Sequence, residues 1–240
     1  MDSSDPVAIE LVNAIHAGDT GTLARLLAGR PGLASEPIHD SRGSKTPLLA
    51  AADWPGYFPG GPAVVRMLID AGADPSCTTS GDKPETPLHW AASSDDADVA
   101  EALISGGADI EMPGGSIGTP LDNAIGYGCW HVARLLVASG ARVDKLWHAA
   151  ALGILPRLEE LLAATPGPAA DDISEAFWQA CHGGQRRAAE LLLSRGADIN
   201  TAPGYSDQAP VDVAAAISTR RENLVTWLRD HGARTAEQAT

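Results

Sequence analysis

The sequence predicts an all-α solenoid, a stack of repeated helix–turn–helix units, and two recurring patterns carry this prediction. A Thr-Pro-Leu triplet begins at Thr46, Thr86 and Thr119, at spacings of 40 and 33 residues. A unit of this size holds two short helices that cannot bury their apolar faces alone, so copies must stack on one another. Gly-Ala pairs follow the second helix of five units, at residues 72–73, 107–108, 140–141, 196–197 and 232–233.

The clearest unit spans residues 86–109. Thr86 offers a side-chain oxygen to the free N–H groups of the first helical turn, and Pro87 suits the first helical position. Leu88 and the alanines at i+3 and i+4 form an apolar stripe of mostly small side chains, which lets neighbouring helices approach closely. Gly107 then ends the second helix, because glycine takes the left-handed conformation without steric strain.

The segment Thr86-Pro87-Leu88-His89-Trp90-Ala91-Ala92, with its period near 33, resembles the ankyrin repeat. The resemblance covers about residues 5–234 and implies a single ankyrin-repeat domain over residues 1–240, with short finger loops between its units. About seven units are expected, and units five and six are irregular and shortened. Their approximate ranges are 5–33, 46–74, 86–109, 119–142, 146–165, 174–198 and 209–234.

The connections between units vary along the chain. Residues 30–45 are polar and rich in turn residues, which predicts a long loop or finger before Thr46. The loop inside the second unit, residues 53–62, is five residues longer than its counterpart in the third and contains three aromatic residues. Residues 75–85 and 110–118 take the place of fingers, whereas the finger before the fifth unit is deleted.

Composition narrows the function classes. The formal net charge of −14 disfavours binding to nucleic-acid phosphates and favours a basic partner. The sequence has no run of about 18 apolar residues, so no membrane span is expected, and the N-terminus lacks a signal-peptide pattern. Three cysteines without a C-x-x-C spacing indicate neither a disulfide framework nor a zinc site, and they suit a reducing cytoplasm. Arginine outnumbers lysine 14 to 3, a bias typical of a high-GC, bacterial source.

The resemblance also implies where a partner binds. In ankyrin repeats, partner contacts lie on the concave face, at the fourth, seventh and eighth residues after the threonine of each first helix. Here these positions are Ala50, Asp53 and Trp54, then Trp90, Ser93 and Ser94, then Asn123, Gly126 and Tyr127. Exposed aromatic residues are typical binding anchors. The predicted partner-binding residues are Asp53, Trp54, Tyr57, Phe58, Trp90, Ser93, Asn123 and Tyr127.

Each of these features also has a purely structural interpretation. The aromatic residues would form a satellite core if they packed against the 53–62 insert. The acidic residues of units two to four, Asp82 and Glu85 among them, would either meet lysine or arginine of a partner or only solvate the surface. His89 and His148 stand at the histidine position of the repeat, where the ring bonds backbone between repeats. Cys181 takes a core-facing position beside His182, which argues against a catalytic dyad.

We therefore expect a non-enzymatic scaffold or adaptor that binds another protein on its concave face as a monomer; a narrower version is an inhibitor of a basic protein. No phosphate-loop, dinucleotide, zinc-protease or nucleophile-elbow motif occurs, so no catalytic residue, cofactor or metal is expected. One alternative is a small-molecule binder or atypical enzyme whose aromatic pocket is roofed by the 53–62 insert. Another is a structural array without a dedicated partner.

Overall fold

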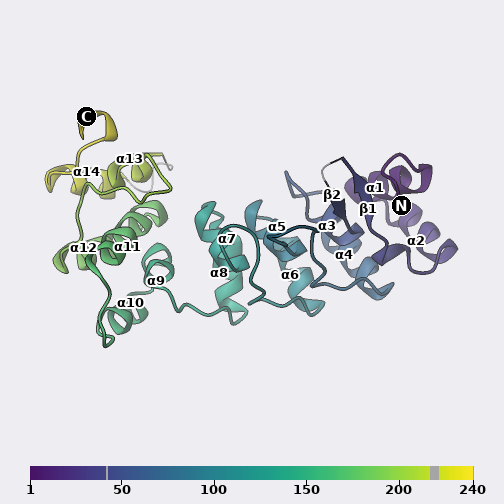
Figure 1. Cartoon of the computed structure of the whole chain (residues 1–240), viewed down its shortest axis with the longest axis horizontal. Coiled ribbons are helices and arrows are strands. Elements are labelled where there is room, and N and C mark those ends of the chain that lie inside the picture. The colour runs from purple at the N-terminus through teal and green to yellow at the C-terminus, as the bar shows by residue number, and fades with distance from the viewer. Residues whose placement is uncertain (42, 217–221, 240) are drawn as a thin grey trace. The chain divides into compact units, whose positions relative to one another are not determined.

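The computed structural model describes residues 1–41, 43–216 and 222–239 (Figure 1). Its contacts divide the chain into two compact units, Met1–Ala141 and Arg142–Thr240. Within each unit, short helices follow one another in pairs, most of them joined by turns of two or three residues. The predicted fold class, an all-α stack of helix–turn–helix units, is confirmed.

The first compact unit stacks its helix pairs in two rows. Helices α1, α3, α5 and α7 contact one another in sequence, and α2, α4, α6 and α8 form the second row (Figure 1). The elements are α1 (Pro6–Ala17), α2 (Thr20–Gly29), the 3-10 helix η1 (Leu33–Ser35), β1 (Ile38–Asp40), β2 (Gly43–Lys45), α3 (Pro47–Ala51), α4 (Gly61–Asp70), α5 (Pro87–Ser93), α6 (Ala97–Ser105), α7 (Pro120–Gly126) and α8 (Trp130–Ala138).

The core between the two rows is aliphatic. Leu48, Leu88 and Leu121 hold the same place in three successive first helices and are at most 1% exposed. Each such leucine contributes roughly 1.5–3 kcal/mol through burial. Alanines on the same helices are equally buried, so the backbones of successive pairs approach closely. The Thr-Pro-Leu triplets therefore mark where α3, α5 and α7 enter the core.

One finger is a β-hairpin. Strands β1 and β2 pair antiparallel, with Ile38 opposite Lys45 and Asp40 opposite Gly43. The hairpin occupies the end of the polar stretch for which the sequence predicts a long loop or finger. The next two fingers, 75–85 and 110–118, have no strand among their described residues, although the Gly114 N–H donates to the Gly118 carbonyl at 2.8 Å.

The insert at residues 53–62 lies against both neighbouring helix pairs. On one side, a side chain at Gly18 would place its Cβ only 2.0 Å from the Pro59 carbonyl oxygen, so only glycine fits there. On the other side, the Tyr57 N–H donates to Asp96 Oδ2 at 2.6 Å. The insert is thus held against its two neighbours at Pro59 and Tyr57.

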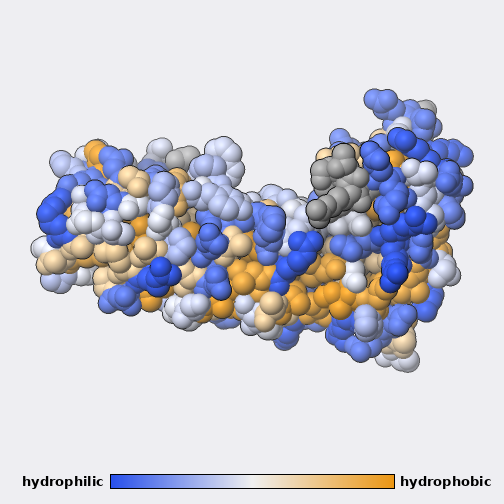
Figure 2. All heavy atoms as spheres, turned by 180° about the vertical axis from the view of Figure 1, so that it is seen from behind, coloured by the Kyte–Doolittle hydropathy of each residue, from blue (hydrophilic) through white to orange (hydrophobic). Residues whose placement is uncertain are grey.

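The second compact unit has a similar order, with a shorter connection between its first two helix pairs. Its elements are α9 (Leu146–Leu152), α10 (Leu155–Leu162), α11 (Ala170–Gly183), α12 (Arg186–Ser194), α13 (Pro210–Ala215), α14 (Glu222–Asp230) and α15 (Ala236–Ala239). Helix α11 contacts α9 and α13 and begins earlier than residue 174, the start predicted for this unit. Figure 2 shows apolar residues at the surface over α10 and α12. Residues 217–221 of the predicted last unit lie outside the described residues.

Candidate functional site

The site begins with three first helices that start in the same way. Helices α3, α5 and α7 follow Thr46, Thr86 and Thr119, and each threonine Oγ1 accepts the N–H three residues later at 3.4 Å. A proline occupies the first turn of each helix. Because the three starts are equivalent, equivalent positions along the helices emerge on the same side of the stack.

His89 ties one of these starts to the next repeat. Its Nδ1 accepts the Thr86 N–H at 3.2 Å, which leaves Nε2 to donate to the Gly118 carbonyl at 3.0 Å. The ring is fully buried, and desolvation lowers its pKa. In the following repeat, Asp122 Oδ2 accepts the Thr119 N–H at 2.7 Å. These buried contacts hold the N-terminal ends of α5 and α7 in register.

A groove of about 220 Å³ opens where these helices end, and we call it the aromatic groove. Trp54 and Tyr127 are 81% and 59% exposed, while Trp90 is half-buried. The groove thus joins one ring from each of three successive repeats. Its lining residues are Asp53, Trp54, Glu85, Trp90, Ser93, Ser94 and Tyr127.

The floor of the aromatic groove is a hydrogen-bonded network around Glu85. The Trp90 indole N–H donates to Glu85 Oε2 at 3.1 Å, and Asn123 Nδ2 donates to Glu85 Oε1 at 3.1 Å. Asn123 Nδ2 also lies 3.2 Å from Ser93 Oγ, and its Oδ1 is buried without a hydrogen-bond partner. The opposite amide orientation would point an oxygen at the Glu85 carboxylate, so the network fixes the amide.

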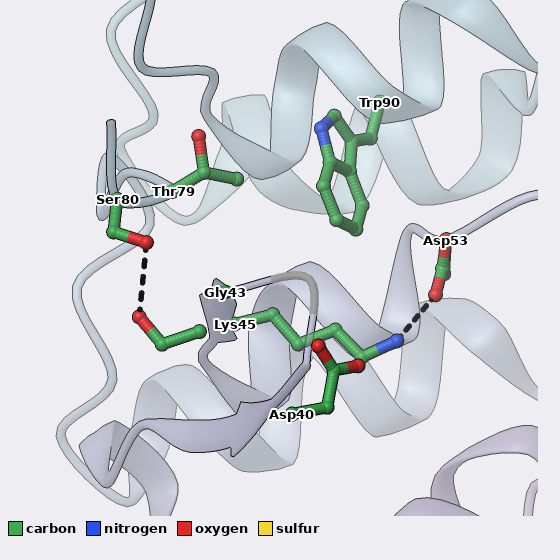
Figure 3. A pocket seen from close by; sticks show the side chains of 8 residues that line it. Asp40, Gly43, Lys45, Asp53, Thr79, Ser80 and Trp90 are labelled. Carbon is green, nitrogen blue, oxygen red and sulfur yellow. Dashed lines mark hydrogen bonds and ion pairs between the residues drawn. The ribbon is translucent and has the colours of Figure 1, made fainter. Parts of the chain in front are cut away.

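A second pocket of about 270 Å³ adjoins the aromatic groove and shares Asp53 and Trp90 with it. Figure 3 shows the Trp90 indole projecting from α5 toward Asp53 and the Lys45 side chain of β2. Lys45 Nζ lies 2.6 Å from Asp53 Oδ2, so this ion pair holds the hairpin against the end of α3. Across the pocket, Ser44 Oγ bonds Ser80 Oγ at 3.3 Å.

Tyr57 and Phe58 do not line either of these pockets. The Phe58 ring stacks on His16 of α1, with centroids 4.2 Å apart. The Tyr57 hydroxyl donates to the Asp95 carbonyl. The expected roof over Trp90 and Tyr127 is therefore not formed by these two rings, because each is held by a neighbouring helix pair instead.

The structure brings together five of the eight residues predicted to bind a partner: Asp53, Trp54, Trp90, Ser93 and Tyr127 line the aromatic groove. Asn123 lies beneath it, only 1% exposed. Sequence reasoning placed Glu85 among the surface acids and missed its central place. The available signal was its position directly before Thr86, where the finger turns into α5.

Comparison with known proteins agrees with the repeat fold. A family model described as ankyrin repeats, in three copies, matches residues 57–145. This chain contains ankyrin repeats. It is also 40% identical over 76 residues to human ankyrin repeat and SOCS box protein 16, and 38% identical over 76 residues to the mouse protein of that name. Each match covers 32% of this chain and 16% of the relative.

The matched ankyrin segment contains Trp90 and Tyr127, while Asp53 and Trp54 precede it. Ankyrin repeats are a protein–protein interaction module, and part of the aromatic groove lies within the matched repeats. Among the described residues, no helix has both the length and the apolar character to cross a membrane, and no cluster of potential metal ligands occurs.

The buried thiols have little nucleophilic character. Burial raises the pKa of Cys129 to about 11, and it also raises the pKa of Cys181, which is fully buried. Since the thiolate is the nucleophile, neither side chain is activated for catalysis. Cys181 faces the core of the second unit, as expected from its position in the repeat.

Proposed function

We propose that this chain is a non-enzymatic ankyrin scaffold that holds a partner protein on the aromatic groove. The observation that supports it most is the gathering of Trp54, Trp90 and Tyr127, one from each of three successive repeats, on one groove. Exposed aromatic side chains that gather on one face mark interaction sites, and the hot spots of protein interfaces are enriched in tryptophan and tyrosine.

Charge favours a basic partner. The chain carries a net charge of −14, and the aromatic groove is lined by two carboxylates without a lysine, arginine or histidine. Opposite charge on a partner would speed association, and the binding of proteins with like charge would be disfavoured. In its narrower form the proposal is an inhibitor of a basic protein, acting as a monomer. The three free cysteines and the arginine-rich composition support a bacterial cytoplasm as its setting.

A protein partner suits the site better than a small molecule. Pockets that enclose drug-sized ligands hold about 300–1,000 Å³. The aromatic groove and its neighbour hold about 220 and 270 Å³. Because Tyr57 and Phe58 are turned away, neither ring closes over the groove. These dimensions favour side chains that protrude from a larger partner.

The proposal is tested by affinity capture from a lysate of the source organism, with bound proteins identified by mass spectrometry. The Trp54→Ala/Trp90→Ala double variant is compared with wild type and with Tyr205→Ala. Tyr205 is 63% exposed but belongs to the second compact unit, so it controls for loss of an exposed ring. We expect a protein that wild type and Tyr205→Ala retain and the double variant loses. Retention by all three would refute the groove as the binding site.

A further inference from the structure

The aromatic groove combines ring surfaces with an uneven balance of charge. Trp54 and Tyr127 leave most of their surface exposed, and Trp90 stands between them in the repeat order. Aromatic faces carry negative charge in their quadrupole and attract cations, with tryptophan the strongest of the three ring types. The rings alone therefore favour a cation in the groove.

Of the two carboxylates in the groove, Glu85 strengthens that preference. Asp53 is paired with Lys45, whose ammonium lies on the side of the adjoining pocket. Glu85 receives hydrogen bonds from two neutral donors, the Trp90 indole and the Asn123 amide. No cation of the described residues is paired with Glu85, so a negative charge remains on the floor of the groove.

The same hydrogen bonds hold the Glu85 carboxylate in place before anything binds. Each of its oxygens accepts one bond and retains lone-pair capacity for another. A ligand donor that meets a carboxylate already fixed in position loses less conformational entropy on binding. With about 220 Å³ available, the groove has room for one long side chain rather than a folded segment.

Resting on the proposed function, we propose that the aromatic groove receives an arginine side chain of the partner, whose guanidinium packs on the rings and donates hydrogen bonds to Glu85. Arginine fits better than lysine for two reasons. Its planar guanidinium stacks on aromatic faces, and its several fixed N–H groups can reach a carboxylate while the face is stacked. Lysine carries a compact, strongly hydrated charge that uses ring faces less well.

The test is an NMR titration of the full chain labelled with ¹⁵N, following the indole N–H signals of its six tryptophans. The probe is N-acetyl-arginine N′-methylamide, and its citrulline counterpart is an uncharged control of nearly the same shape. The lysine analogue forms the third arm. The Trp54 and Trp90 signals are assigned from Trp54→Phe and Trp90→Phe variants, and Trp147 and Trp178 of the second unit serve as internal references.

We expect the arginine probe to shift the Trp54 and Trp90 signals with a dissociation constant on the order of a millimolar or weaker. The citrulline probe should shift them much less, and the reference signals should not move. Glu85→Gln, which keeps the size of the side chain, should weaken binding about fivefold or more. Tyr127→Ala should weaken it by about 2- to 30-fold, the range expected for one cation–π contact.

Equal shifts from arginine and citrulline, or equal shifts at the reference tryptophans, would overturn the inference. Equal binding of the lysine analogue would overturn the assignment to arginine. Thermal unfolding of Glu85→Gln and Tyr127→Ala checks that both variants are folded when binding is compared. If no probe binds while the Trp54→Ala/Trp90→Ala variant still loses its captured protein, the arginine inference fails and the proposed function stands. If the arginine probe binds while the Trp54→Ala/Trp90→Ala variant still retains its captured protein, the groove recognises arginine and the proposed function fails.

Discussion

Phe177, Trp178 and Trp227 are buried in the core of the second compact unit, whereas the buried side chains described in the first unit include no phenylalanine, tyrosine or tryptophan. The first unit fills its interior with leucine, valine, isoleucine and alanine, and its phenylalanine, tyrosine and tryptophan rings are half-buried or exposed. Aromatic residues thus fill the core of the second unit, whereas in the first unit they lie outside the core, although both units consist of helix pairs. An aromatic residue indicates a binding site here only when its position in the repeat is taken into account.

The starts of the first helices differ in a parallel way. In the first unit, Thr46, Thr86 and Thr119 cap α3, α5 and α7 with their side chains. In the second unit, α11 and α13 begin after alanines. Only a carboxylate three residues later accepts a backbone N–H there, at 3.0 Å for α11 and 3.3 Å for α13. Helix starts are therefore fixed locally in the first unit, and the second relies more on its aromatic core.

The largest expected effect tests that reliance. Phe177→Ala removes a fully buried ring and should lower the free energy of unfolding by about 3–5 kcal/mol. Urea unfolding measures the loss, and hydrogen exchange should place it in α9–α12. Tyr127→Ala is the control from the first unit, where an exposed ring should change stability by less than about 0.5 kcal/mol. A Phe177→Ala loss below about 1 kcal/mol would show that the core does not depend on this ring.

The next effect concerns the close approach of α9 and α11. A Cβ added at Gly183 would lie 1.9 Å from the Ala151 carbonyl oxygen, so Gly183→Ala must push the two backbones apart. We expect a loss of about 1–3 kcal/mol, measured by urea unfolding. Gly167→Ala is the matched control, because the nearest atom to its added Cβ would be 3.7 Å away. Equal stability of the two variants would mean that α9 and α11 can separate freely.

A smaller effect, the dependence of the unfolding free energy on pH, arises from His89 in the first unit. Desolvation lowers the pKa of His89 below its usual 6.5, although the Gly118 hydrogen bond, Glu85 and Asp122 partly oppose this shift. The unfolded chain therefore binds the proton more readily. Stability from the neutral ring is complete above pH 6.5 and is lost as the pH falls toward the folded-state pKa. A protonated Nδ1 can no longer accept from Thr86, and each lost bond costs about 0.5–1.5 kcal/mol.

Unfolding free energies at pH 7 and pH 5 measure this effect. His89→Gln should reduce the difference between the two pH values, because glutamine can accept the Thr86 N–H without titrating in this range. His39→Gln, a change at an exposed histidine of β1, should leave the difference close to that of wild type. An unchanged difference in His89→Gln would show that His89 is not the responsible group.

Local chemistry explains what the sequence could predict. Threonine and proline determine where α5 and α7 begin. The Thr-Pro-Leu register places Trp54 and Tyr127 at the eighth residue after a threonine and Trp90 at the fourth, on the same side of the stack. The start of α11 was harder to predict, because it lacks a threonine cap and depends on Asp172. The β1–β2 hairpin was also beyond a specific prediction, since its polar strands lack an alternating apolar pattern.

The remaining features of the site depend on distant partners. Phe58 lies outside the groove because its ring stacks on His16, which belongs to a different helix pair. Glu85 becomes the floor of the groove only when the indole of Trp90 and the amide of Asn123 reach it. No spacing in the sequence encodes these side-chain conformations, since they follow from how neighbouring repeats pack.

The smallest expected effect on stability decides between the two interpretations of Trp54. Its ring is 81% exposed, so Trp54→Ala should change the free energy of unfolding by no more than about 0.5 kcal/mol. Trp227→Ala makes the same substitution at a ring that is only 8% exposed and should lower stability by about 3–5 kcal/mol. Urea unfolding of the two variants compares them directly. If Trp54→Ala lost more than about 1 kcal/mol, the ring would belong to a satellite core around the insert. If stability is unchanged while partner capture is lost, the exposed ring is explained by binding, since the fold does not need it.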